Sequence, residues 1–306
     1  MIRVAVLMAL MCLSVSQLSC ANDSRIAASN LLWPDGIKDN PITYEKQDVM
    51  RTYDYGHPDA PLGTCRVYSH VSTPTYYIYQ PEPQNNTGVG IVVLPGGGYR
   101  DIWLDTEGHD IGLFFKERGI TSLVVKYRTN SPVEGDRTLM DDKDYVPYAV
   151  ADAREGIRIL RSRSKELKID AKKIGVGGFS AGGHLTLSLC LGPDDKDTHT
   201  DPDFAFLIYP WIEPHFEKQV PAAKDLPPMF IANGQQDLVT PPDVCATFYE
   251  TLSRNKVPAE LHIYGKGEHG FTLGLGKGHS VVQWTGSFLA WLKDIEMIPA
   301  PSAKTK

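Results

Sequence analysis

A serine, an aspartate and a histidine in this sequence follow one another in an order that suits nucleophilic acyl chemistry. Ser180 lies at the centre of the run GFSAG at positions 178–182, a G-x-S-x-G pattern between an apolar run and an apolar helical pattern. A sharp turn with small neighbours holds a serine oxygen clear of the backbone, and the following helix N-terminus favours negative charge there. We therefore predict that Ser180 is a nucleophile. A serine that only caps the helix is the alternative.

An acid and a base follow Ser180 in the chain. A serine hydroxyl needs a general base, and that base needs a carboxylate to orient it. Asp237 and His269 each follow an apolar run, which places both in loops at the C-terminal ends of predicted strands, where α/β sheets collect functional groups. We predict Asp237 as the acid and His269 as the base. Asp243 is the reserve acid, although an acid in the first turn of the next helix typically stabilises the helix dipole.

A glycine-rich loop lies upstream, where the run PGGGY at 95–99 follows the apolar segment 90–94. Glycines let backbone N–H groups approach a ligand without obstruction by side chains. We predict an oxyanion hole formed by Gly97 or Gly98 together with Ala181. An ordinary glycine-rich turn is the alternative, but the position of the loop ahead of the serine favours the oxyanion hole.

Aromatic and polar side chains near these loops are candidates for contact with substrate. Tyr99, Trp103 and Trp211 suit a sugar platform or an acyl pocket, and packing in the core is equally compatible with each of them. Glu107 and His109 lie just past the glycine loop. Contact with substrate is one interpretation for this pair, and a solvated helix start is the favoured one.

The other histidines have simpler interpretations. His184, one helical turn beyond the serine, is expected to pack, His262 belongs to the alternation of a strand, and His279 begins the final helix. No pair of histidines has metal-ligand spacing with a nearby set of acids or cysteines, so we predict no metal and no cofactor.

Alternating apolar runs and helical patterns predict an α/β fold with a mostly parallel central sheet and helices on both faces. The predicted strands cover 76–79, 90–94, 120–127, 174–177, 204–209, 229–232 and 261–264. The predicted helices cover 108–118, 146–160, 181–191, 242–255 and 281–293.

Composition and length fit one catalytic domain. The 306 residues are 42% hydrophobic and 22% charged, which is ordinary for a globular protein, and no repeat or low-complexity linker divides them. A net charge of -6 gives no basic stripe for nucleic acid. We expect an extended arm over 22–61 with no visible chemistry, a catalytic domain over 62–295 and a tail over 296–306.

The first 21 residues predict a signal peptide, with Arg3 ahead of an apolar stretch and small residues at its end. Cleavage gives a soluble exported protein, periplasmic or extracellular. The alternative is an outer-membrane lipoprotein anchored at Cys20, although Gln17 stands where a lipobox prefers leucine. Cys65, Cys190 and Cys245 then remain, too few for a disulfide framework, and one bridge at most can form.

Together these segments resemble the acetylxylan-esterase-like carbohydrate esterases of the α/β-hydrolase superfamily, which are often loosely described as lipases or xylanases. The resemblance covers roughly 89–292 and rests on the segments at 94–99, 125–128, 178–184, 234–239 and 264–271. It implies Ser180, Asp237 and His269 as the triad and an acetylated polysaccharide as substrate. Pro95 departs from hormone-sensitive-lipase-like relatives, which begin the oxyanion loop with histidine, and leaves the anchoring of the loop open.

The expected function is therefore that of a serine esterase that removes short acyl groups from a carbohydrate such as xylan through an acyl-enzyme. The alternatives are a general short-chain carboxylesterase or lipase-like enzyme, a serine peptidase of the prolyl-oligopeptidase type, and an inactive hydrolase scaffold that only binds. The expected partner is a small-molecule or polysaccharide ester. The sequence does not set the oligomeric state.

Overall fold

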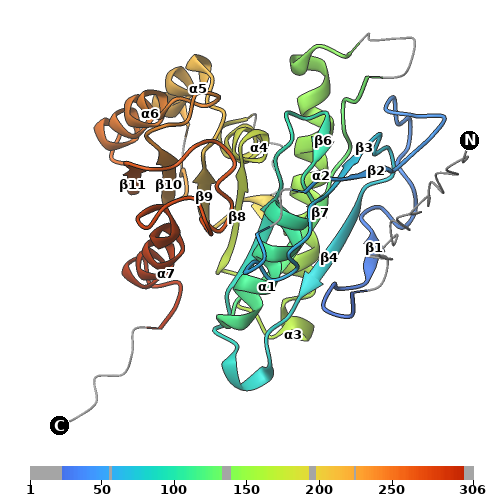
Figure 1. Cartoon of the computed structure of the whole chain (residues 1–306), viewed down its shortest axis with the longest axis horizontal. Helices are drawn as coiled ribbons and strands as arrows, with labels where there is room; N and C mark the ends of the chain where they lie inside the picture. The colour runs from blue at the N-terminus through green and yellow to red at the C-terminus, as the bar shows by residue number, and fades with distance from the viewer. Residues whose placement is uncertain (1–22, 55–56, 133–138, 193–197, 224, 300–306) are drawn as a thin grey trace, which may run out of the picture.

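A computed structural model describes residues 23–54, 57–132, 139–192, 198–223 and 225–299. Its centre is a sheet of eight strands with helices on both faces (Figure 1). In spatial order the strands are β1 (Ser29–Leu31), β4 (Thr75–Tyr79), β7 (Thr121–Lys126), β5 (Gly90–Leu94), β8 (Ile174–Phe179), β9 (Phe204–Ile208), β10 (Met229–Gly234) and β11 (Ala259–Tyr264).

The pairing of these strands confirms the predicted fold class. Every neighbouring pair from β7 to β11 is parallel, and β4 is antiparallel to both of its neighbours. Strands β5, β7, β8, β9 and β10 are buried along their whole length. Parallel strands covered on both faces are uniformly apolar, which is why continuous apolar runs marked them in the sequence.

Strand β9 shows how the two faces of the sheet differ. On one face, the Phe206 ring lies 5.2 Å from the ring of Phe288 in α7. On the other face, Leu207 joins an apolar cluster with Leu187 of α4 and Phe248 of α6. The helices are α1 (Asp110–Glu117), α2 (Asp142–Ser162), α3 (Ser164–Leu167), α4 (Ala181–Leu191), α5 (Pro214–Gln219), α6 (Pro242–Arg254) and α7 (Trp284–Asp294).

A second, antiparallel sheet joins β2 (Val49–Thr52), β3 (Arg66–Ser69) and β6 (Asp101–Ile102). The segment 22–61, expected as an extended arm, contributes β2 to this sheet and β1 to the edge of the central sheet. The two short strands escaped the sequence analysis because three or four exposed residues show no clear alternation. The arm is thus attached to the catalytic domain at two places.

The predicted signal peptide and Cys20 lie outside the described residues, as do positions 300–306 of the predicted tail. Within the described ranges, no helix combines the length and the apolar character needed to cross a membrane. Cys65, Cys190 and Cys245 are unpaired thiols. Burial raises the pKa of each thiol to about 12, which keeps all three protonated and unreactive.

Candidate active site

Ser180 occupies a strained turn between β8 and α4. Its φ of 52° and ψ of -115° are unusual for a residue with a side chain, and such strain persists only where neighbours enforce it. The Ser180 N–H donates to the Ile208 carbonyl at 3.0 Å, and the Ser180 carbonyl accepts from the Trp211 N–H at 3.1 Å. A β-carbon on Gly182 would lie 2.0 Å from the Leu94 carbonyl oxygen, so only glycine fits there. The turn therefore presents a half-exposed serine at the C-terminal edge of the sheet.

The structure brings Ser180, His269 and Asp237 into one hydrogen-bonded chain. His269 Nε2 lies 2.9 Å from Ser180 Oγ, and His269 Nδ1 lies 2.8 Å from Asp237 Oδ2. The three residues follow β8, β11 and β10, whose parallel arrangement carries their C-terminal ends to one edge of the sheet. The predicted nucleophile, base and acid thus have the mutual distances that acyl transfer requires.

Both oxygens of the Asp237 carboxylate accept hydrogen bonds. Its Oδ1 accepts the N–H groups of Val239 and Thr240 at 2.8 Å each, and its Oδ2 accepts the Thr240 hydroxyl at 2.8 Å. Burial by itself raises the pKa of Asp237, but hydrogen bonds from His269 and Thr240 outweigh it and hold that pKa below its ordinary value. Asp243, the reserve acid, is exposed in the first turn of α6. The geometry therefore favours Asp237.

The glycine loop, defined here as residues 95–98, passes directly beside the serine. A β-carbon on Gly96 would lie 3.0 Å from Ser180 Cβ. Gly97 has a φ of +133°, and a β-carbon there would lie 2.0 Å from the Asp101 carbonyl oxygen. Within the part of the chain that the structure describes, the N–H groups of Gly97, Gly98 and Ala181 donate to no protein group. Three backbone donors therefore remain free around the predicted nucleophile.

The buried carboxylate of Glu107 fixes the glycine loop through a hydrogen bond. Its Oε2 accepts the Gly96 N–H at 2.6 Å, and its Oε1 accepts the Tyr209 hydroxyl at 2.8 Å. A second anchor is the Tyr127 hydroxyl, which donates to the Pro95 carbonyl at 2.7 Å. These bonds hold the loop in place although it begins with Pro95 rather than histidine. Burial raises the pKa of Glu107, although both hydrogen bonds act in the opposite direction.

The solvated helix start favoured for Glu107 and His109 is wrong. Residues Asp105–His109 form a buried π-helical turn ahead of α1. The His109 ring packs edge-on against Tyr77 at 4.7 Å, its Nδ1 lies 2.7 Å from the Tyr79 hydroxyl, and burial lowers its pKa to about 4. Charged residue types next to a glycine loop suggested solvent, whereas the turn is buried and Arg66 of β3 donates hydrogen bonds to Asp105 within it.

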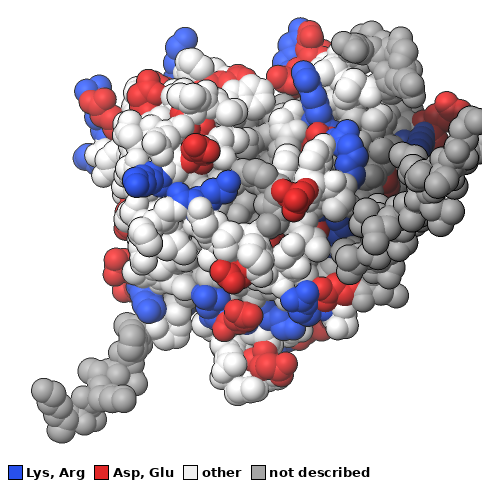
Figure 2. Space-filling view, viewed as in Figure 1, with Lys and Arg blue, Asp and Glu red and all other residues white. Residues whose placement is uncertain are grey.

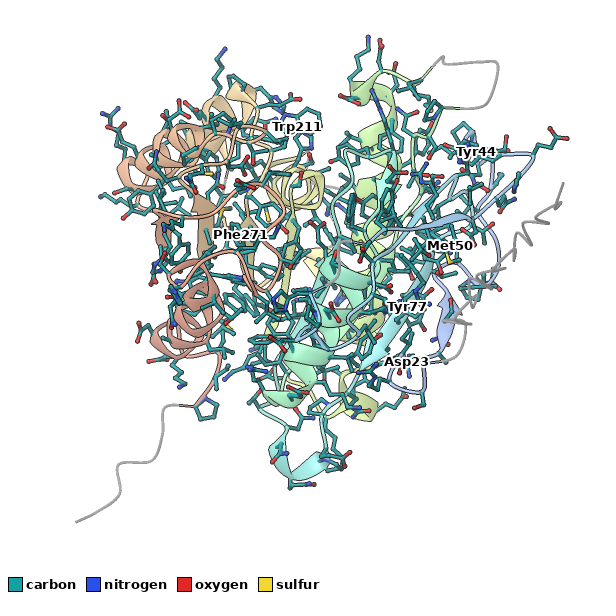
Figure 3. The ribbon with its side chains drawn as sticks, in the orientation of Figure 1. Asp23, Tyr44, Met50, Tyr77, Trp211 and Phe271 are labelled. Atoms are coloured by element: carbon teal, nitrogen blue, oxygen red, sulfur yellow. The ribbon has the colours of Figure 1, made fainter. Side chains whose placement is uncertain are left out.

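Of the three aromatic candidates, Tyr99 has no free ring face. It is 1% exposed, and its ring packs edge-on against Tyr127 and Tyr145. Its role as a sugar platform is therefore wrong. Trp103 and Trp211 are half-buried. Trp211, labelled beside α5 in Figure 3, lines a pocket of about 320 Å³ together with Gly98 of the glycine loop.

His184 packs as expected, behind Trp211. The two rings stack with centroids 4.5 Å apart, and His184 Nδ1 lies 2.6 Å from the Tyr99 hydroxyl. Burial lowers the pKa of His184 to about 3, and its buried Nε2 has no hydrogen-bond partner among the described residues. Nε2 lies 3.8 Å from a Glu213 oxygen, beyond hydrogen-bond distance. A cavity of about 610 Å³ between α2, α4 and α5 adjoins this ring.

Charge is distributed without a dominant sign. Figure 2 shows basic and acidic side chains interspersed on the face it presents. Among the described residues, no group of three histidine, cysteine, aspartate or glutamate side chains is placed to hold a metal ion.

Comparison with known proteins places these features in a family. Residues 143–224 match a family described by the alpha/beta hydrolase fold, and residues 207–296 match the prolyl oligopeptidase family. The acetylxylan esterase of Xylanibacter ruminicola is 30% identical over 250 residues, 72% of this chain and 48% of that protein. Endo-1,4-beta-xylanase B of Butyrivibrio fibrisolvens is 27% identical over 214 residues, 60% of this chain and 32% of that protein. The chain spans about half or less of the length of these relatives.

Solved structures agree on the fold. The acetyl ester-xyloside bifunctional hydrolase of Caldicellulosiruptor lactoaceticus superimposes with a TM-score of 0.64 and 25% identity, over 89% of this chain and 98% of that one. A thermophilic esterase of Thermogutta terrifontis gives a TM-score of 0.61 over 76% of this chain and 91% of that one, and at 23% identity it supports the fold alone. The chain is an α/β-hydrolase. Within that superfamily it is similar to acetylxylan esterases, the group that its motifs resemble.

Proposed function

We propose that this protein is a serine esterase that removes acetyl groups from a carbohydrate such as xylan. The observation that carries the proposal is the continuous chain from Ser180 Oγ through His269 to Asp237, with bonds of 2.9 and 2.8 Å. That chain ends beside three backbone N–H groups that are free to bind an oxyanion. Such a combination suits attack on a carbonyl carbon followed by stabilisation of the resulting negative charge.

The reaction proceeds in two halves. In the first, Ser180 Oγ bonds to the ester carbonyl carbon, its proton passes to His269 Nε2, and the N–H groups of Gly98 and Ala181 bind the oxyanion. The carbon–oxygen bond to the alcohol then breaks, and His269 returns the proton to the leaving alcohol. In the second half, water attacks the carbonyl carbon of the acyl-enzyme while His269 accepts its proton. The bond between that carbon and Ser180 Oγ then breaks, His269 returns the proton to Oγ, and acetic acid leaves. Asp237 orients the imidazole and stabilises its positive charge throughout.

An acetylated carbohydrate is favoured by the relatives. The similar protein from Xylanibacter ruminicola is named an acetylxylan esterase, and the structure from Caldicellulosiruptor lactoaceticus is titled an acetyl ester-xyloside hydrolase. The second candidate is a serine peptidase, because residues 207–296, which include the predicted acid and base, match the prolyl oligopeptidase family. Both reactions use the same triad, so the substrate decides between them.

Replacement of Ser180 by alanine tests the proposal. We expect turnover of p-nitrophenyl acetate and of acetylated xylan to fall roughly 10⁴- to 10⁶-fold, because only binding and oxyanion stabilisation remain. Ser162→Ala, at an exposed serine that ends α2, is the matched control and retains activity. Dipeptide amides are assayed in parallel. If the protein cleaves the amides without preferring esters, it is a peptidase. If the wild-type protein turns over neither substrate, it is a binding scaffold.

A further inference from the structure

The arm and the glycine loop are tied together by the small sheet. Strand β2 of the arm pairs with β3, and β3 pairs with β6, which begins two residues after Tyr99. An ion pair between Arg51 of β2 and Asp101 of β6 joins the two outer strands directly. Tyr53 and Asp54, which directly follow β2, are therefore tied through the small sheet to the segment that follows the glycine loop.

One feature that this arrangement creates is a pair of stacked aromatic rings, Tyr53 and Trp103. The two rings stack with centroids 5.5 Å apart and an interplanar angle of 20°. The Trp103 N–H donates to the Gly96 carbonyl at 3.1 Å, which connects the stack to the glycine loop. Tyr53 is 42% exposed, far more than a tyrosine that serves only as packing. Much of the Tyr53 side chain thus remains open to solvent, on a ring stacked against Trp103, whose backbone bonds to the glycine loop.

The second feature to which the arm contributes is a polar pocket of about 250 Å³. The arm contributes Asp54 and His57 to its wall, and the turn and helix that begin at Asp105 contribute Thr106 and Asp110. Gly270, which directly follows the proposed base, forms part of the same wall. Segments far apart in sequence therefore enclose a space next to the triad.

The wall of this pocket carries side chains that can hydrogen-bond to a ligand. Asp54 is exposed and His57 is half-buried, so a carboxylate and an imidazole are accessible from the pocket. Asp110 is 1% exposed and accepts a hydrogen bond from the Leu62 N–H at 2.7 Å. Burial raises the pKa of Asp110 to about 7 because that bond does not offset the loss of water. This polar wall suits a ligand with hydroxyl groups.

We propose that the arm builds a subsite for the sugar that carries the ester. A pyranose has an apolar face that suits the Tyr53–Trp103 stack and hydroxyl groups that suit the pocket of Asp54, His57 and Asp110. The subsite binds the alcohol portion of the ester and orients it for attack. This inference rests on the proposed function, and it names the residues by which that function selects carbohydrate esters over simple ones.

The test compares two esters that share an acetyl group and differ in the alcohol. In Tyr53→Ala, we expect kcat/KM for acetylated xylotriose to fall about tenfold, mainly through KM, the size of one lost stacking contact. For p-nitrophenyl acetate, which has no sugar, the decrease stays within about twofold. Tyr53→Phe keeps the ring and restores the carbohydrate activity. The matched control is Met50→Ala, because Met50 is a 51% exposed apolar residue of β2 on the same arm (Figure 3).

A second variant and a binding measurement separate the subsite from the esterase itself. His57→Ala is expected to reproduce the selective loss without touching the aromatic stack. Calorimetry with unacetylated xylotriose and the Ser180→Ala protein measures sugar binding when no turnover occurs, and Tyr53→Ala added to that protein should weaken it about tenfold. If Tyr53→Ala lowers kcat/KM equally for both esters, or leaves xylotriose binding unchanged, the subsite proposal is wrong and the esterase proposal is unaffected. If the wild-type protein hydrolyses no ester but binds xylotriose in a way that depends on Tyr53, the esterase proposal is wrong and the subsite proposal is unaffected.

Discussion

The two flanks of Ser180 are built in different ways. On the polar flank, formed by Glu107, Tyr209, Asp237 and Thr240, each carboxylate oxygen accepts at least one hydrogen bond. The Thr240 hydroxyl also lies 3.1 Å from the Tyr209 carbonyl, which links the two acids. The ring flank is formed by Tyr99, His184, Trp211 and Phe216. The His184 ring stacks on Trp211 and meets Tyr99 and Phe216 edge-on, and its Nε2 is buried without a hydrogen-bond partner among the described residues.

This difference separates positioning from packing. Short hydrogen bonds between buried groups fix atoms to within a few tenths of an ångström, which acyl transfer requires of the base and the oxyanion donors. Ring packing tolerates larger adjustments and leaves room for substrate, as the cavities beside Trp211 and His184 show. We therefore expect substitutions on the polar flank to change kcat and those on the ring flank to change stability or KM.

The largest expected effect on the polar flank is at Asp237. Asp237→Asn keeps the shape of the side chain but removes the charge and presents the wrong hydrogen-bond partner to His269, so kcat is expected to fall about 10⁴-fold. Hydrolysis of p-nitrophenyl acetate under saturating conditions measures it. Asp243→Asn, at the exposed acid in the first turn of α6, is the matched control. A large loss in the control together with a small one at Asp237 would show that the acid is misassigned.

Glu107→Gln is expected to have the next largest effect. A glutamine amide has one acceptor oxygen where Glu107 uses two, so either the Gly96 N–H or the Tyr209 hydroxyl loses its acceptor and the glycine loop loosens. We expect kcat to fall about 100-fold, the cost of one displaced oxyanion donor, with KM changed no more than a few-fold. Steady-state kinetics and thermal unfolding are measured together.

Two further measurements show whether the Glu107 effect is one of positioning. Binding of a boronic acid, which mimics the tetrahedral intermediate, should weaken by the same factor as kcat/KM, because both depend on the oxyanion donors. Glu117→Gln, at an exposed acid of α1, should leave every parameter unchanged. If Glu107→Gln lowers the melting temperature but not kcat, the buried carboxylate is a structural group only, and the two flanks do not differ in role.

The hydrogen-bonded chain of Ser180, His269 and Asp237 could be predicted from the sequence because each residue follows an apolar run that ends at the same edge of the sheet. Parallel strands convert such linear positions into spatial neighbours, so the motif around Ser180 and the order of Asp237 and His269 were sufficient. The helix after the serine was predicted with its observed bounds, 181–191, for the same reason. Local patterns determine these features.

Glu107 and the arm were missed because their roles depend on contacts between distant segments. Nothing near position 107 indicates that Gly96 and Tyr209 would both donate to its carboxylate, and an acid after a glycine loop resembles a solvated helix start. Tyr53 lies in a polar, proline-interrupted stretch, and only the pairing of β2 with β3 brings it onto Trp103. Tertiary pairing of short exposed strands leaves too weak a periodic signal for detection.

The smallest expected effect on catalysis, and a clear one on stability, is at His184 on the ring flank. Because burial keeps its pKa near 3 in the folded protein, the unfolded chain binds more protons between about pH 3 and 6.5, and the free energy of unfolding falls as the pH falls through that window. Glu213, just before α5, and His215, in α5, face the His184 ring. Repulsion from His215 lowers the pKa of His184 further. From pH 7 to pH 5 this one group should remove about 2 kcal/mol of stability.

His184→Asn isolates that contribution, because an asparagine oxygen can still accept from the Tyr99 hydroxyl but does not titrate. The variant is less stable at pH 7, since it loses the stacking on Trp211, and its stability declines about 2 kcal/mol less than that of wild type when urea unfolding is repeated at pH 5. His279→Asn, at an exposed histidine, should leave the wild-type slope unchanged. Activity at pH 7 stays within about tenfold of wild type, because the ring packs behind Trp211 and contacts no reacting atom. A loss of kcat as large as that of Glu107→Gln would erase the distinction between the two flanks.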